Sequence, residues 1–151
     1  MAYVARPLGG RAVRATGWLY LSLFPLPVVF FLTALATDAA YAASEYLQWL
    51  HFSQWLIAAG LAFGAIATLV LVVEMIAHPA MRTSAAWAHA GFFWVALAVE
   101  LVNAFVHTRD GWTAVVPTGL ALSVVGAVLA LLAVSALFAL QARWVAMRGL
   151  R

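Results

Sequence analysis

Residues 47–73 read LQWLHFSQWLIAAGLAFGAIATLVLVV, a run that contains no Asp, Glu, Lys or Arg. A helix needs about 20 mostly apolar residues to cross the hydrocarbon core of a bilayer, so this run is long enough for one span. Other apolar runs lie at 15–37, 83–99 and 111–142, and the run at 83–99 is long enough only if Glu100 is also inside the membrane. We therefore expect residues 1–151 to form one all-α domain, an integral membrane four-helix bundle with helices at about 16–43, 49–78, 84–107 and 113–144.

The composition fits a membrane protein and excludes other classes. Of the 151 residues, 67% are hydrophobic and 9% are charged, whereas soluble proteins have roughly half and a quarter. A soluble domain of this size could not bury so much apolar surface. The chain has no cysteine, which excludes disulfides, thiolate metal sites, iron–sulfur clusters and covalently attached haem.

The arginines predict the orientation of the bundle. Cytoplasmic loops carry an excess of basic residues. Seven of the eight arginines would lie on one side of the membrane if all four helices span it, and one on the other: Arg6, Arg11, Arg14, Arg82, Arg143, Arg148 and Arg151 against Arg109. We expect a membrane protein with both termini in the cytoplasm. No motif supports binding to nucleic acid.

Prolines predict two local irregularities. Pro25 and Pro27 should kink the first helix, because proline lacks the backbone N–H that a helix interior needs. Pro117 is expected in the first turn of the last helix, where that N–H is not needed.

Small residues gather on two helix faces, where they allow helix backbones to approach closely in lipid. One face carries Gly60 and Gly64, continued by Ala67, and the other carries Gly119, Ser123, Gly126, Ala130 and Ala133. Packing inside the bundle is the simpler interpretation. The alternative is that the Gly60/Gly64 face or the Gly119/Ser123/Gly126 face binds a second copy or a protein partner.

The helix expected at 84–107 carries a polar stripe. Spacings of three and four residues place one set on a single face: His89, Phe93, Ala96, Glu100, Asn103 and His107. Ionisable groups inside a membrane are costly, and each is therefore a functional candidate. We expect Asp38, Glu100, Asn103 and His107 to form an outer polar cluster, either as a structural network or as a cofactor-binding site open to the periplasm.

A second set of ionisable residues is expected near the cytoplasmic side. Glu74 and His78 are four residues apart, and His89 follows on the next helix beyond Arg82. These three residues, Glu74, His78 and His89, form the predicted inner cluster. It is either an interfacial ion-pair network with Arg82 or a site for proton relay or a quinone headgroup.

Two pairs of histidines are expected at matching depths in the membrane, His51 with His107 and His78 with His89. They raise the alternative of a b-type haem. Axial ligation needs two histidines on facing helices, but on a straight helix His51 points away from the Gly60 and Glu74 face. No tight His and carboxylate motif predicts a metal site. Familiar catalytic signatures are also absent, so we predict neither catalytic residues nor an enzyme.

Several segments together resemble a bacterial family of small membrane proteins, the domain of unknown function 2231 (DUF2231) family. The segments that carry the resemblance are Phe24-Pro25, Thr37-Asp38, Trp55-Leu56-Ile57-Ala58-Ala59-Gly60-Leu61, Arg82 with Trp87-Ala88-His89, Asn103 and Arg109. Glu74 stands where members usually have Asp. Trp18 and Leu23 stand where many members have His, and Phe93 stands where many have Asn, so a site built on those residues would be incomplete here.

The resemblance implies a four-helix membrane protein without an established activity, and association with periplasmic quinoprotein or sugar-dehydrogenase systems. Our leading hypothesis is a non-catalytic membrane subunit or anchor of a larger, redox or dehydrogenase assembly. One alternative is an electron-transfer protein that binds quinone or haem b. The other is an ion- or proton-conducting oligomer whose pore is lined by the Glu100 face.

Overall fold

The computed structural model describes the backbone of residues 17–149 and the side chains of residues 17–139 and 141. Its helices confirm an all-α bundle with four segments long and apolar enough to cross a membrane. These spans are Gly17–Ser44, Leu47–Ala77, Ser84–Val106 and Trp112–Ala139. Most of the arginines that predict the orientation lie outside the described side chains: Arg6, Arg11, Arg14, Arg143, Arg148 and Arg151.

The first span has an interruption near its start and ends at a tight backbone turn. Residues 17–23 are helical, and α2 (Pro25–Ser44) continues them after an interruption at Phe24. The interruption lies beside Pro25 and Pro27, neither of which can donate a backbone hydrogen bond, while Phe24 keeps α-helical backbone angles and the kink stays a prediction. The helix stops at Glu45, whose positive φ of 55° turns the chain toward α3 (Leu47–Ala77).

The third span is α4 (Ser84–Val106), which follows a single turn of 3-10 helix, η1 (Pro79–Met81). Thr83 caps α4, because its hydroxyl accepts a hydrogen bond from the Ala86 N–H. Such a cap satisfies one of the backbone donors that a helix start leaves free.

The fourth predicted helix, 113–144, is not continuous. A short helix, α5 (Trp112–Val115), is followed by α6 (Thr118–Gly149). Pro117 lies just before α6 instead of inside its first turn, after a cis peptide bond from Val116. The last helix also runs beyond the predicted end at residue 144.

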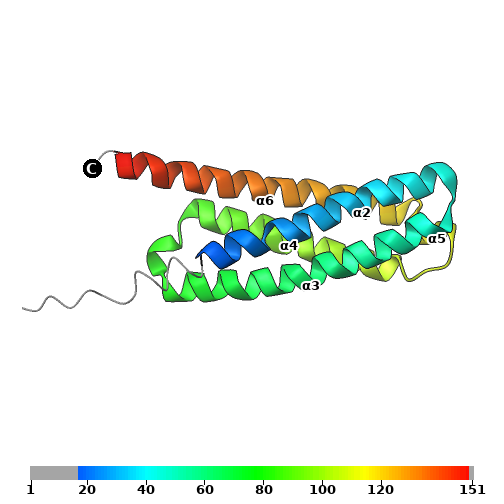
Figure 1. Ribbon diagram of the computed structural model, residues 1–151, viewed down its shortest axis with the longest axis horizontal. Helices are drawn as coiled ribbons and strands as arrows, with labels where there is room; N and C mark the ends of the chain where they lie inside the picture. Colours follow the sequence, from blue (N-terminus) through cyan, green and yellow to red (C-terminus); the bar gives the residue numbers. More distant parts are fainter. Residues whose placement is uncertain (1–16, 150–151) are drawn as a thin grey trace, which may run out of the picture.

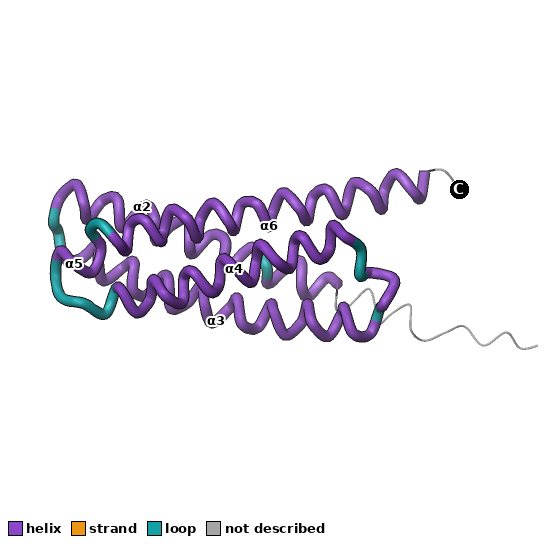
Figure 2. Tube along the Cα trace, turned by 180° about the vertical axis from the view of Figure 1, so that it is seen from behind, coloured by secondary structure: helices purple, strands orange, loops and turns teal. Residues whose placement is uncertain are grey.

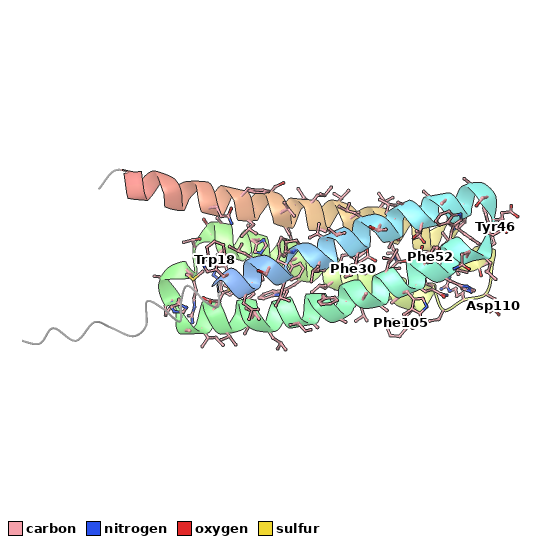
Figure 3. The ribbon with its side chains drawn as sticks, in the orientation of Figure 1. Trp18, Phe30, Tyr46, Phe52, Phe105 and Asp110 are labelled. Carbon is pink, nitrogen blue, oxygen red and sulfur yellow. The ribbon has the colours of Figure 1, made fainter. Side chains whose placement is uncertain are left out.

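The long helices run antiparallel around one core (Figure 1). α2 packs most extensively against α3, and α4 against α6. The start of the described chain and the C-terminus of α6 lie together at one end of the bundle. The short helix α5 lies at the opposite end (Figure 2). We call these the terminal end and the loop end. Trp18 lies at the terminal end, and Tyr46 and Asp110 lie at the loop end (Figure 3).

Apolar side chains fill the middle of the bundle and also cover its outside. Phe31, Phe93 and Ala67 belong to the main buried cluster, and a smaller cluster around Tyr41 and Val115 lies beneath α5. Large apolar side chains are exposed along α3 and α6, among them Leu69 and Leu131. An outer surface of this kind suits contact with lipid chains.

The two small-residue faces point inward. A Cβ atom added to Gly60 would meet the Phe31 ring of α2, and one added to Gly64 would meet Leu97 of α4. Gly119 and Gly126 on α6 are likewise buried against the loop end and α4. Neighbouring helices of the same chain therefore cover these glycines, and binding of a second copy or a partner stays a prediction.

Candidate functional site

The predicted polar stripe of α4 is its buried face. His89, Phe93, Ala96, Glu100 and Asn103 are all buried, at the predicted spacing. His107 follows as the C-cap residue and is buried too. Facing the bundle keeps Glu100 away from lipid, where an ionisable group would be costly.

The structure brings three residues of the outer polar cluster into one network with Ser123 of α6. His107 Nε2 lies 2.9 Å from Asp38 Oδ1, and the Ser123 hydroxyl donates to the other oxygen of Asp38. The Asn103 amide donates to Ser123 Oγ at 2.8 Å. The network therefore ties α2, α4 and α6 together.

Glu100 joins this network through Asn103. Asn103 Nδ2 donates to Glu100 Oε2 at 3.0 Å, which uses the second amide proton. Glu100 Oε1 and Asn103 Oδ1 are buried and have no hydrogen-bond partner among the described residues. The two ends of the network thus differ: Asp38 is bonded through both oxygens, whereas Glu100 is bonded through one.

The hydrogen bonds of His107 determine where its protons lie. Nδ1 is 3.0 Å from the Asn103 carbonyl oxygen, which can only accept, so Nδ1 carries a proton. Nε2 faces Asp38, and a single proton between these two atoms satisfies the contact. If the proton is on His107, the two side chains form an ion pair, and if it is on Asp38 they form a neutral pair. In both cases the pair has no net charge.

His107 lies at the boundary of the bundle, just beyond the end of α4. Burial acts to lower the pKa of His107, but the hydrogen bond and charge of Asp38, the Asn103 carbonyl and the charge of Glu100 outweigh it and raise that pKa. A groove lined by His107, Gln54 and Thr108 lies next to the ring. The Gln54 amide also donates to the His107 carbonyl at 2.6 Å.

Sequence reasoning assigned Ser123 only to helix packing. The signal that could have identified its second role is its position between Gly119 and Gly126, on the α6 face that the polar stripe of α4 must meet. A hydroxyl among small residues in a membrane helix is a candidate hydrogen-bond partner for the facing helix. The structure shows that Ser123 is fully buried and in contact with both Asp38 and Asn103.

The inner cluster separates into two groups of contacts. His78 Nδ1 lies 3.1 Å from Glu74 Oε2, an ion-pair distance, although the geometry is not that of a hydrogen bond. Arg82 does not join this pair in a hydrogen bond, because its guanidinium donates to the carbonyl oxygens of Met75 and Ile76. The predicted Glu–His–Arg network is therefore reduced to Glu74 and His78.

His89 has its own partners on two other helices. Its Nδ1 is 2.8 Å from the Ala133 carbonyl oxygen on α6, and its Nε2 faces the Tyr20 hydroxyl. Since a carbonyl only accepts, Nδ1 carries the proton and Nε2 accepts from Tyr20. Nothing in the sequence indicated Tyr20, which lies in the helical segment before Pro25.

A cavity at the terminal end brings the two groups together again. Tyr20, Glu74 and His89 line an opening of about 180 Å³, which we call the inner cavity. The rest of its lining is mainly apolar and includes Leu71, Met75, Met81 and Leu137. Glu74 is only 3% exposed, and neither of its carboxyl oxygens has a hydrogen-bond partner among the described residues.

Apolar packing separates the inner cavity from the outer polar cluster. Phe93 and Ala96 occupy the stripe of α4 between His89 and Glu100, and Phe31 and Ile57 are buried as well. The described chain therefore has polar groups near both ends and an apolar middle.

The histidines do not fit axial ligation of a haem. His107 and His89 use both ring nitrogens in buried hydrogen bonds. His51, the predicted partner of His107, is exposed. Within the described residues, no three His, Cys, Asp or Glu side chains converge as metal ligands would.

Comparison with known families found one match. A family model described as predicted membrane protein (DUF2231) matches residues 22–146. Comparisons with curated proteins and with solved structures gave no match. The matched range includes every residue of the outer polar cluster and of the inner cluster, but it begins after Tyr20.

Proposed function

Because the chain belongs to the DUF2231 family of predicted membrane proteins, whose description states no activity, we propose a function from the geometry of its site. We propose that the protein is a non-catalytic membrane protein that binds a small hydrogen-bond-donating molecule in the inner cavity. The observation that carries the proposal is Glu74, a buried carboxyl group at the wall of an apolar cavity: one oxygen lies 3.1 Å from His78 Nδ1, but neither oxygen has a hydrogen-bond partner among the described residues. A buried polar group without a partner costs roughly 1–3 kcal/mol, and a bound donor would remove that cost.

The polar atoms of Tyr20 and Glu74 at the cavity are acceptors, whereas Gln141, which also lines it, has an amide that can both donate and accept. Tyr20 donates its only proton to His89, so its oxygen retains lone pairs that can accept. An ionised Glu74 is an acceptor only. Beside Glu74 and Tyr20 the matching ligand therefore carries hydroxyl or amino groups, and within the quinone hypothesis these two residues favour the quinol, which has two hydroxyl donors, over the quinone, which has none.

The other two hypotheses receive less support. A subunit or anchor would have to dock through a surface other than the Gly60/Gly64 and Gly119/Ser123/Gly126 faces, which are covered. A pore lined by the Glu100 face between copies would need that face to be accessible, but Glu100 is 0% exposed within one chain. Co-purification of a partner from the native membrane remains the test of the subunit hypothesis.

Replacing Glu74 with Gln tests the proposed function. The probes are an alkyl hydroquinone, kept reduced, and its dimethyl ether, which has no donor, titrated into the purified protein in lipid nanodiscs. We expect the wild type to bind the hydroquinone and not the ether, and E74Q to bind at least about tenfold more weakly, since a hydrogen bond to a charged group contributes about 1.5–3 kcal/mol.

Glu45 offers a matched control for this test, because it is an exposed carboxyl at the loop end. E45Q makes the same chemical change and should leave binding unaltered. Equal binding of hydroquinone and ether, or equal binding by E74Q and the wild type, would contradict the proposed function.

A further inference from the structure

The inner cavity is too small to contain a whole bilayer amphiphile. Its volume is about 180 Å³, and an apolar protein cavity of roughly 150 Å³ holds one benzene molecule. One substituted ring therefore fills it. Ligands that bury themselves completely usually occupy pockets of about 300–1,000 Å³, so a larger ligand must extend out of the cavity.

A second hollow lies next to the inner cavity, on the outside of the bundle. It has a volume of about 330 Å³ and lies between α2 and α6. The two hollows share Leu21, Leu137 and Gln141 as wall residues. We call this second hollow the tail groove.

The walls of the tail groove are apolar and face outward. Val29 of α2 is 57% exposed, and Phe138 of α6 lies across from it with 66% of its surface exposed. In a chain that spans the membrane, such exposed apolar side chains contact lipid tails. The groove therefore leads from the inner cavity to the hydrocarbon region of the bilayer.

The tail groove lies beside the interruption of the first span. Pro25 and Phe24 both line it, at the point where the segment 17–23 gives way to α2. Proline has no N–H for the preceding turn, and its ring crowds that turn, which bends a helix away from ideal packing. α2 also packs less extensively against α6 than against α3.

We infer that the ligand of the inner cavity is a tailed amphiphile that enters sideways from the bilayer, with a donor-bearing ring beside Glu74 and an apolar tail in the tail groove. This inference rests on the proposed function, because it assigns the ring to the same cavity. An apolar tail in the groove gains burial against Val29 and Phe138, and burial contributes in proportion to the apolar area covered. An opening toward lipid favours a ligand that partitions into the bilayer over one that stays in water.

The test compares two hydroquinones with the same ring, one without a tail and one with a ten-carbon tail, in nanodiscs. Val29→Trp fills the groove at its exposed wall. Val73→Trp is the matched control, because Val73 on α3 is also 57% exposed and does not line the groove. We expect V29W to weaken the tailed ligand at least tenfold and to leave the tailless ring unchanged, while V73W changes neither.

A labelling experiment on the wild type gives the same answer without a substitution. A tailed hydroquinone with a photoreactive diazirine at the end of its tail is expected to label peptides that contain residues 25–29 and 134–138. Labelling elsewhere, or a V29W variant that binds the tailed ligand as the wild type does, overturns the inference. If the tailless ring binds through Glu74 but the tail adds no affinity, this inference fails and the proposed function stands; if neither ligand binds, both fail.

Discussion

In the outer polar cluster the hydrogen-bond donors all have acceptors, whereas Glu100 Oε1 and Asn103 Oδ1 have no partner among the described residues. The Asn103 amide uses both of its protons, on Glu100 and on Ser123. Asp38 accepts through both oxygens. Burial of these groups is tolerated because the partners come with them, since a buried polar atom without a partner costs far more than a hydrogen bond gains.

Asp38→Ala is expected to destabilise the protein by at least about 1–3 kcal/mol, because it leaves the Ser123 hydroxyl and His107 Nε2 buried without an acceptor. Thermal unfolding in detergent measures the loss, and Asp110→Ala at an exposed carboxyl is the control. An Asp38→Ala variant as stable as Asp110→Ala would show that the network contributes nothing.

The stability difference between the wild type and Asp38→Ala is expected to depend on pH. Asp38 helps to raise the pKa of His107 in the folded protein above its ordinary value of 6.5. A raised pKa stabilises the fold fully below 6.5, and the stabilisation disappears as pH rises through the folded value. The stability difference between wild type and Asp38→Ala should therefore be largest near pH 6 and decrease at higher pH. A difference that grows with pH would contradict the assigned hydrogen bond.

At the scale of helices, glycine creates room for polar side chains. A Cβ atom on Gly126 would meet the Glu100 carboxyl group, and one on Gly119 would come within 2.9 Å of the His107 ring. The small residues of α6 therefore leave the space that the polar side chains of the α4 stripe occupy. Close helix contact and buried hydrogen bonds depend on the same positions, as is common in membrane bundles.

Gly126→Ala and Gly91→Ala form a matched pair that tests this role. An added methyl at Gly126 forces the Glu100 side chain to move, and overpacking of this kind costs about 1–3 kcal/mol. Gly91 has nothing within 4 Å of an added Cβ, so Gly91→Ala should be neutral or more stable by up to about 1 kcal/mol through helix propensity. Equal melting temperatures for the two variants would refute the packing argument.

On the scale of the whole molecule, an even number of spans places both ends of the described chain on the same side of the membrane. The terminal end holds the start of the described chain and the end of α6 (Figure 1). Seven arginines of eight belong to that side by sequence, and we propose that this side is cytoplasmic, in the inner membrane of a bacterium. The inner cavity would then lie near the cytoplasmic surface and the outer polar cluster near the periplasm.

Reporter fusions measure this orientation. A green fluorescent protein fused after Arg151 should fluoresce, and alkaline phosphatase fused there should be inactive, because the enzyme matures only outside the cytoplasm. Phosphatase inserted at Arg109, the one arginine of the opposite side, should be active. The reverse pattern of activities would place the terminal end outside and contradict the proposed orientation.

Properties that depend on local composition were predictable from the chain alone. The four spans follow from apolar length, and the buried face of α4 follows from its spacing, since Glu100, Asn103 and His107 had to turn away from lipid wherever their partners were. The family was likewise indicated by short motifs in order. These features need no knowledge of which helix lies beside which.

Other features exist only once the helices are packed. The rotation of α6 decides that Ser123 meets Asp38, and that Gly119 and Gly126 face into the bundle. The inner cavity depends on Tyr20, Glu74 and His89 arriving from three different helices, and the tail groove exists only because α6 runs past Pro25. Spacing along one helix records which residues share a face, but it contains no information about what that face contacts, because contacts between helices depend on their relative rotation and depth.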